Sequence, residues 1–214
     1  MKKGIIFDMD GTLWDSASSV AECWSNVLQN KYDGVRVVTE EDLQSVMGLT
    51  MDNLAKALFP KVEEGLRLQM LNDCCDAENR YLEKYGAALY EGLEEVLEQL
   101  HEEYHLYIVS NCQSGYIEAF LSYYGFGHFF DDIECFGNNH LKKGENIRNI
   151  VERNQLAKAV YVGDIQGDYD ASCEAKVEFI HAAYGFGNVQ QDVERIQSLM
   201  ELPACVNKIF RKEN

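Results

Sequence analysis

The stretch "IIFDMDGTLWDS", from Ile5 to Ser16, decides the fold. Residues 4–7 form a short apolar run, as in a strand that is buried on both faces of a parallel sheet. Two aspartates, Asp8 and Asp10, follow this run, and Gly11 comes directly after them. A carboxylate at the end of a buried strand needs a partner, a metal ion or a proton. The stretch therefore predicts a buried strand that ends in a functional site.

The composition limits what such a site can bind. The chain has 214 residues, of which 46% are hydrophobic, and 36 acidic against 19 basic residues give a net charge of −17. This length is enough for one good core, or for one domain with a smaller companion. A surface this negative repels the backbone of nucleic acids, so we expect no nucleic-acid partner. It also repels anionic substrates, so a phosphate site here needs local positive charge from lysine or a metal ion.

The cysteines and the lengths of the apolar runs indicate where in the cell the protein is expected. The seven cysteines are odd in number and form no Cys-x-x-Cys motif, which is typical of a reduced protein with free thiols. The opening "MKKGIIFDMDG" has an apolar run too short for a signal peptide, and no stretch approaches the roughly 18 apolar residues of a membrane helix. We expect a soluble cytoplasmic protein without a membrane partner, present as a monomer or a homodimer.

Two kinds of pattern follow along the chain. Residues 16–30, 40–46, 50–59 and 63–85 have helix-like spacing, with Thr39 and Asp42 as a capping box. From Gly92 onward helices alternate with strand-like segments at 105–110, 132–137, 158–164 and 177–185, and a terminal helical segment follows. Such alternation predicts a parallel sheet with helices on both faces.

The predicted fold is therefore α/β: a Rossmann-like parallel sheet flanked by helices, with a small all-helical domain inserted after the first strand. We place the core at residues 1–14 and 87–214 and the helical insert at residues 15–86. The chain crosses between them near residues 14–16 and 85–91, where Gly86 and Gly92 are suited to hinges.

Polar residues occur where the predicted strands end. Because ligands of open parallel sheets bind at the carboxyl ends of the strands, these residues are site candidates. Beyond the first strand they are Ser110 and Asn111, the lysines 142 and 143, and the aspartates 164 and 168. Each also has a simpler interpretation. Asp8, Asp10 and Asp164 could cap turns or helices, and Ser110 with Asn111 could cap a helix at 113–123.

Four motifs carry a family resemblance. They are "DMDGTLWDS", "VSN", "KKGENI" and "VGDIQGD", and they occur in this order over nearly the whole chain. In this combination the chain resembles the haloacid dehalogenase superfamily, in the branch with a helical cap after the first strand. Phosphoglycolate phosphatase-like enzymes belong to that branch.

The resemblance implies a role for each motif residue. Asp8 is the expected nucleophile and Asp10 the expected general acid and base. Mg²⁺ is the expected cofactor, bound by Asp8, by the carbonyl of Asp10 and by Asp164. Phosphate is expected on Ser110, Asn111 and Lys143, to which Thr12 can add a hydroxyl or amide contact. Asp168 either binds the metal, directly or through water, or orients Lys143, and we prefer Lys143 to Lys142 because it adjoins the glycine that opens the next helix.

Elementary chemistry supports these roles. A carboxylate and a phosphate dianion repel one another, and a magnesium ion shared between them cancels that repulsion. An aspartyl phosphate divides one difficult hydrolysis into two easier steps. The first step needs a proton for the leaving alkoxide and the second needs a base for water, and a single protonated carboxyl group at Asp10 can serve both.

The helical insert is expected to close over the site and exclude water. Its loop "MGLTMDN" at residues 47–53 is expected to contact the leaving group through Gly48, Leu49 and Thr50, as the corresponding loop does in related capped enzymes. Trp14 and Trp24 either line the pocket or belong to the core.

The sequence thus predicts a magnesium-dependent phosphatase of a small phosphorylated metabolite, acting through an aspartyl-phosphate intermediate. Two alternatives stay open. A phosphosugar mutase of the same family would use the same aspartates together with basic residues of the insert, for which Lys56, Lys61 and Arg67 are candidates. A non-catalytic phosphoaspartate switch would use similar residues without turnover.

Overall fold

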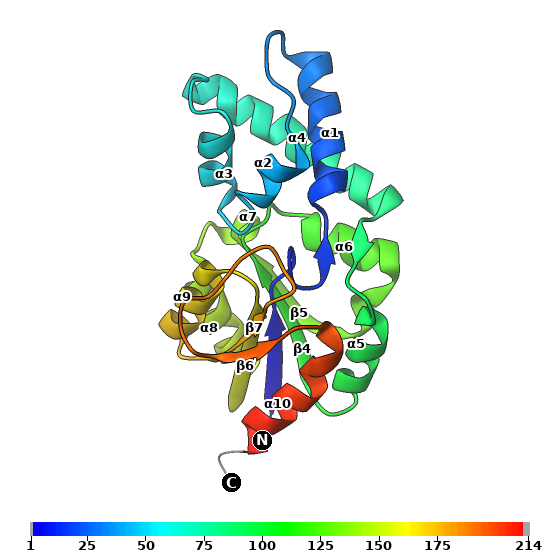
Figure 1. Cartoon of the computed structure of the whole chain (residues 1–214), viewed down its shortest axis with the longest axis vertical. Coiled ribbons are helices and arrows are strands. Elements are labelled where there is room, and N and C mark those ends of the chain that lie inside the picture. Colours follow the sequence, from blue (N-terminus) through cyan, green and yellow to red (C-terminus); the bar gives the residue numbers. More distant parts are fainter. Residues whose placement is uncertain (1, 212–214) are drawn as a thin grey trace.

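The computed structural model describes residues 2–211 and shows an α/β core with a helical lobe above it (Figure 1). The core contains a six-stranded sheet in the order β5-β4-β1-β6-β7-β8, and every neighbouring pair is parallel. The strands are β1 (Lys3–Phe7), β4 (His105–Ser110), β5 (Phe130–Cys135), β6 (Lys158–Gly163), β7 (Glu178–Ala182) and β8 (Glu194–Ile196). The predicted fold class is confirmed.

Helices cover both faces of this sheet, as the alternation of side chains along a strand requires. Ile5 and Phe7 point into the cluster shared with α5 (Leu93–His101), α6 (Tyr116–Tyr124) and α10 (Leu202–Arg211). Ile6, between them, points to the opposite face, which α8 (Lys143–Arg153) and α9 (Gln166–Ala175) cover. All three side chains are fully buried, so β1 is the central buried strand that its apolar run predicts.

Several short elements were not predicted from the sequence. The segment after β7 contains the edge strand β8 and the 3₁₀ helix η2 (Leu199–Glu201) before the expected terminal helix. The single-turn helix α7 (Phe136–Asn139) follows β5, and the 3₁₀ helix η1 (Phe126–His128) precedes it. Elements of three or four residues are too short to show a hydrophobic period, so the pattern cannot reveal them.

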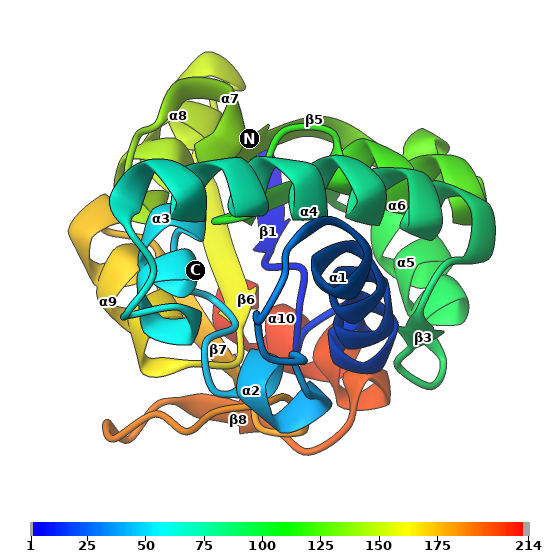
Figure 2. The ribbon, with the colours of Figure 1, turned by 90° about the horizontal axis from the view of Figure 1, so that it is seen from above.

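The helical lobe, defined here as residues 17–85, consists of α1 (Ala17–Lys31), α2 (Glu40–Gln44), α3 (Met51–Leu58) and α4 (Glu64–Tyr85). Seen from above, the long helix α4 spans the lobe, with α3 near one end and α6 of the core near the other (Figure 2). These helices follow the four predicted ones closely. The predicted capping box of Thr39 and Asp42 is confirmed, with both reciprocal hydrogen bonds present.

A two-stranded antiparallel ribbon joins the lobe to the core. It pairs β2 (Trp14–Asp15) with β3 (Ala88–Leu89), one strand from each chain crossing. Gly86 and Gly92, on either side of β3, have φ of 66° and 76°, which other residues adopt only with strain. The two crossings therefore lie side by side and form one narrow connection. None of the helices in the described part of the chain combines the length and apolar character needed to cross a membrane.

Candidate active site

Three adjacent strands deliver the polar residues of the site. Asp8 follows β1, Ser110 ends β4 and Asp164 follows β6, and the sheet order places β1 between the other two. The chain proceeds from β1 to β4 and β5 on one side and returns to β6 and β7 on the other. The site thus lies where the strand order reverses, the usual ligand position in open α/β sheets.

Three carboxylates and one lysine form the centre of the site. Asp8, Asp164 and Asp168 are buried, and each offers an oxygen within 4.8 Å of the other two. The Lys143 ammonium is 2.9 Å from Oδ1 of Asp8 and 2.6 Å from Oδ1 of Asp168. Lys143 is only 5% exposed, whereas its neighbour Lys142 is exposed. The geometry therefore places Lys143, and not Lys142, in the site.

Asp168 is held by backbone as well as by lysine. Its Oδ2 accepts hydrogen bonds from the amides of Asp164 and Ile165 at 3.0 and 3.2 Å, at the start of α9. Its Oδ1 accepts from Lys143. Asp168 therefore orients Lys143 and fixes the turn that carries Asp164, and it also lies close enough to share a cation.

Burial and mutual repulsion change the titration of this cluster. The pKa of Asp8 is raised to about 7 by burial and by the charge of Asp168, with Lys143 acting in the opposite direction. The pKa of Asp164 is raised to about 8 by burial and by the charges of Asp168 and Asp8. Burial lowers the pKa of Lys143, but its two carboxylate partners outweigh this, so the pKa lies above its ordinary value.

The donor set fits a divalent cation. Three buried carboxylates face a single lysine, which leaves two negative charges without compensation if all three are ionised. Buried charge is costly unless it is paired, and hard cations such as Mg²⁺ and Ca²⁺ prefer oxygen ligands. A bound divalent cation would neutralise the cluster that burial and repulsion now penalise.

Asp10 lies beside this cluster in a hydrogen-bond network of its own. Its Oδ1 accepts from Ser16 Oγ and from the Tyr116 hydroxyl, both at 2.6 Å. The Tyr116 and Ser16 hydroxyl oxygens lie 2.8 Å apart. Burial raises the pKa of Asp10, and the hydrogen bonds from Ser16 and Tyr116 oppose that rise. Sequence reasoning missed Tyr116, because one tyrosine in an apolar helix gives no distinguishing signal.

Gly11 permits the close approach of the β1 and β6 loops. Its φ of 79° is left-handed, and a Cβ atom there would lie 2.1 Å from Oδ2 of Asp164. That oxygen instead accepts the amide of Phe186 at 2.7 Å. A side chain at this position would thus push Asp164 out of the cluster.

The three further candidates for phosphate contact lie nearby. Ser110 and Asn111 line a cavity above Asp8, while the buried Thr12 hydroxyl has no hydrogen-bond partner within the described part of the chain. The alternative in which Ser110 and Asn111 cap the next helix is wrong, because α6 begins at Tyr116 after Gly115. Asn111 also reaches the lobe, since its Nδ2 donates to the Gly48 carbonyl at 2.8 Å.

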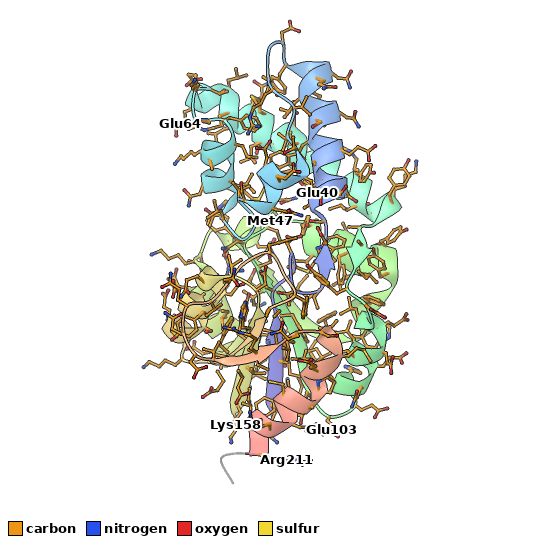
Figure 3. All side chains as sticks on the ribbon, viewed as in Figure 1. Glu40, Met47, Glu64, Glu103, Lys158 and Arg211 are labelled. Atoms are coloured by element: carbon orange, nitrogen blue, oxygen red, sulfur yellow. The ribbon has the colours of Figure 1, made fainter. Side chains whose placement is uncertain are left out.

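The cavity lies between the core and the lobe and has a volume of about 40 Å³. Its floor contains Asp8 and Asp10, and its roof comes from the lobe. Of the three lobe residues expected to contact the leaving group, Gly48 and Leu49 line the cavity, while Thr50 is the N-cap of α3 and accepts a hydrogen bond from Asn53. Figure 3 shows Met47, another lining residue, on the side of the lobe that faces the sheet.

One acidic residue of the roof was not predicted. Glu78, on α4, is buried and lines the cavity, and Trp24 Nε1 donates a hydrogen bond to its Oε2. Burial raises the pKa of Glu78 to about 7, and the charge of Asp10 contributes to the rise. Trp24 thus belongs to the cavity wall, whereas Trp14 packs against Tyr116 and Phe120 in the core.

The basic candidates of the lobe lie elsewhere. Lys56 and Lys61 are exposed, and Arg67, half-buried, donates to the Val62 carbonyl. The 22-residue helix α4 separates Arg67 from Glu78 by eleven positions, or roughly 16 Å along the axis. These residues give no basic pair facing the cavity.

A larger hollow, of about 820 Å³, lies at the other end of the sheet. It is lined by Lys158 and Glu178, at the amino ends of β6 and β7. Figure 3 shows Lys158 at the opposite end of the molecule from Met47. The smaller cavity is lined by Asp8 of the carboxylate cluster, so we take it as the candidate active site.

Comparisons with known proteins agree with this geometry. The family model described as haloacid dehalogenase-like hydrolase matches residues 5–182. The phosphoglycolate phosphatase of Photobacterium profundum is 28% identical over 195 residues, covering 86% of this chain and 84% of its own length.

Two solved structures show the same fold. A haloacid dehalogenase-like family hydrolase from Streptococcus pneumoniae superimposes with a TM-score of 0.76 at 21% identity, over 95% of this chain and 97% of its own. A β-phosphoglucomutase from Clostridium difficile gives 0.74 at 15% identity, over 98% and 99%. Hydrolases and a mutase share this architecture, so the fold alone does not separate the two activities.

Proposed function

This chain belongs to the haloacid dehalogenase-like hydrolase family, and we propose that it is a magnesium-dependent phosphatase of a small phosphomonoester. The observation that carries the proposal is the buried arrangement of Asp8, Asp164 and Asp168 around Lys143. A nucleophilic carboxylate, a site for a divalent cation and a fixed ammonium group are the parts that transfer of a phosphoryl group to the protein requires.

Asp8, Asp164 and Asp168, with the backbone carbonyl of Asp10, would hold the cation. When bound, it supplies positive charge that offsets the repulsion between the Asp8 carboxylate and the phosphate. We take Mg²⁺ as the ion because the donors are all oxygens and because Mg²⁺ commonly binds through one or two carboxylates together with substrate phosphate.

In the first step an oxygen of Asp8 attacks phosphorus. A bond forms between that oxygen and phosphorus, the bond from phosphorus to the ester oxygen breaks, and the leaving alkoxide takes a proton from Asp10. The products of this step are an alcohol and an aspartyl phosphate. Asp10 is held for proton transfer by Ser16 and Tyr116, which fix one of its oxygens from two sides.

In the second step water attacks the aspartyl phosphate. Asp10, now ionised, removes a proton from the water as the new bond to oxygen forms and the bond to Asp8 breaks. Inorganic phosphate leaves, and both aspartates return to their starting states. Lys143, Ser110 and the Asn111 amide act as donors to the phosphate oxygens during both steps, and Thr12 can contribute its buried hydroxyl.

The helical lobe serves as a cap in this proposal. A cavity of about 40 Å³ is far smaller than the roughly 300 Å³ or more of ordinary ligand pockets. Substrate can therefore enter only if the lobe moves away from the sheet, and its return excludes bulk water from the aspartyl phosphate. The β2–β3 ribbon is the narrow connection about which such movement is expected.

The test uses the purified full chain with p-nitrophenyl phosphate and a panel of phosphorylated metabolites. Hydrolysis is expected with Mg²⁺ and not with excess EDTA, and Asp8→Asn is expected to lower kcat at least about a thousandfold. The exposed Asp170→Asn serves as a matched control that keeps wild-type rates. Wild-type turnover by a folded Asp8→Asn protein would overturn the assignment of the nucleophile.

The same assay separates the alternatives. A mutase would isomerise a sugar phosphate without releasing inorganic phosphate, and a coupled assay for both products detects this. A phosphoaspartate switch would accumulate phosphorylated Asp8 with no turnover of any ester. Either result would replace the phosphatase proposal.

A further inference from the structure

The cavity roof carries one carboxyl group, that of Glu78. Glu78 lies in the middle of α4, is 4% exposed and shares the cavity lining with Asp10 on the opposite, core side. Trp24 Nε1 binds its Oε2, so the side chain is held in place. A buried carboxyl group costs free energy unless it is partnered, and the lobe retains this one inside the cavity.

The rest of the roof is apolar. The other large side chains of the lobe that line the cavity come from Val20, Trp24, Leu43, Met47, Leu49, Met51 and Leu54. Gln113, which the core contributes, also lines the cavity and acts on Glu78 as a hydrogen-bonding side chain. A leaving group in this space meets mainly hydrocarbon and one carboxyl group of the lobe, that of Glu78, since the Trp24 indole N–H is already bound to Glu78.

Positive charge is missing from this part of the cavity. Among the described residues that line it, none is a lysine or an arginine. Lys143, beneath the floor, is paired with Asp8 and Asp168. On α4 itself, Arg80 and Lys84 are exposed. An anionic group on the leaving alcohol would therefore face Glu78 and Asp10 without a cation to compensate it.

From this placement, and resting on the phosphatase activity proposed above, we infer the substrate class. The structure assigns Glu78 as the residue that selects the leaving group. The preferred substrate is a small phosphomonoester whose alcohol carries a hydrogen-bond donor, a hydroxyl or an ammonium group, and no second anionic group. Esters with a carboxylate on the alcohol, such as phosphoglycolate, are disfavoured although relatives carry that substrate in their names.

A matched series of two-carbon esters tests the inference. The probes are 2-aminoethyl phosphate, 2-hydroxyethyl phosphate, ethyl phosphate and phosphoglycolate, which differ only in the group at the far carbon. They are assayed with Mg²⁺ at pH 8, where Glu78, with a pKa of about 7, is ionised. We expect kcat/KM for the amino and hydroxyl esters to exceed that for phosphoglycolate by about tenfold or more.

Two variants of α4 assign the effect to one side chain. Glu78→Gln keeps the size of the residue and an acceptor for Trp24 but removes the charge, so the ratio of kcat/KM between 2-aminoethyl phosphate and phosphoglycolate is expected to fall about tenfold. Glu83→Gln, an exposed change on the same helix, is expected to leave the ratio unchanged. A thermal melt of each variant establishes that it is folded.

The outcomes separate this inference from the proposed function. If phosphoglycolate is hydrolysed as well as the amino and hydroxyl esters by the wild type, the inference is overturned, whatever the variants do. It is also overturned if folded Glu78→Gln keeps the wild-type ratio. Turnover of p-nitrophenyl phosphate in those same experiments shows that the phosphatase assignment survives, whereas no turnover of any ester removes both.

Discussion

The floor and the roof of the active-site cavity are built differently. The floor, formed by Asp8 and Asp10, continues into a buried cluster of ions that Asp8 forms with Lys143, Asp164 and Asp168, at the ends of buried strands and the start of helices. The roof is apolar apart from Glu78 and belongs to a lobe connected through a two-stranded ribbon. If the proposed function holds, the phosphoryl chemistry and the choice of leaving group lie on separate parts of the chain.

The two parts also differ in how firmly they are held. Backbone amides bind Asp168 and Asp164 within the floor, at the edge of a sheet buried on both faces. Few hydrogen bonds tie the lobe to the core near the cavity, and they include Asn111 to Gly48 and Asn79 to Ser114, each at 2.8 Å. The floor is therefore preorganised, and fewer hydrogen bonds would have to break for the proposed movement of the lobe.

The largest expected effect is on the proton transfer of the floor. Asp10→Asn removes the group proposed to protonate the alkoxide, so alkyl esters such as ethyl phosphate are expected to lose roughly 10²- to 10⁴-fold in kcat/KM. The first step with p-nitrophenyl phosphate should lose much less, because p-nitrophenolate needs no proton to leave. Rapid-mixing kinetics of the variant measure the rate of this first step, which is expected to appear as a burst of p-nitrophenolate before a slow steady state.

Asp170→Asn, an exposed change of the same type, controls for the loss of a charge. Equal losses for the alkyl and aryl esters in the first step would contradict the role of Asp10 as an acid.

The adjacent lysines offer the next comparison. Lys143→Gln removes the ammonium that contacts Asp8 and Asp168, so kcat is expected to fall roughly 10²- to 10³-fold. Lys142→Gln changes an exposed neighbour that contacts neither carboxylate. Its kcat should stay within about twofold of the wild-type value, because a single exposed charge has little effect. Steady-state kinetics with p-nitrophenyl phosphate and Mg²⁺ measure both. A similar loss of kcat in the two variants would contradict the assignment of Lys143, rather than Lys142, to the site.

The smallest effect concerns the roof and appears in stability. The pKa of Glu78 is raised by burial from 4.5 to about 7, so the folded protein keeps a proton that the unfolded chain has lost. By linkage, stability then falls as pH rises through this window, with a contribution on the order of 3 kcal/mol at most. Glu78→Gln should therefore show a smaller decrease of the melting temperature between pH 5 and pH 8 than the wild type.

Other buried acids titrate in the same window, so the measured quantity is the difference between the two proteins. Glu83→Gln provides the reference for an exposed glutamate on α4. If Glu78→Gln and the wild type lose the same stability over this range, Glu78 is not held in the buried, protonated form.

Most of the core could be predicted from the sequence because its signals are local. The apolar run before Asp8, the repeated change between strand and helix, and the capping box of Thr39 each depend on a few neighbouring residues. The β2–β3 ribbon could not be predicted in this way, since each of its strands has only two residues and forms only when both crossings meet. The N-cap position of Thr50 could not be predicted for a similar reason, because it depends on where α3 begins.

The α/β fold class, the haloacid dehalogenase-like motifs and the aspartates after the first strand could be found in the sequence, because strand–helix alternation and the end of an apolar run are local patterns. The order of the strands in the sheet is not a local pattern and came from the tertiary structure. The burial of Lys143 and the exposure of Lys142 also came from it, since both residues lie at the start of one helix and differ in the direction they face. The tertiary structure also revealed Glu78, which the sequence does not distinguish from the other acidic residues of α4. Whether such a side chain is exposed or lines a cavity depends on how the lobe packs against the sheet, and no local pattern contains that information.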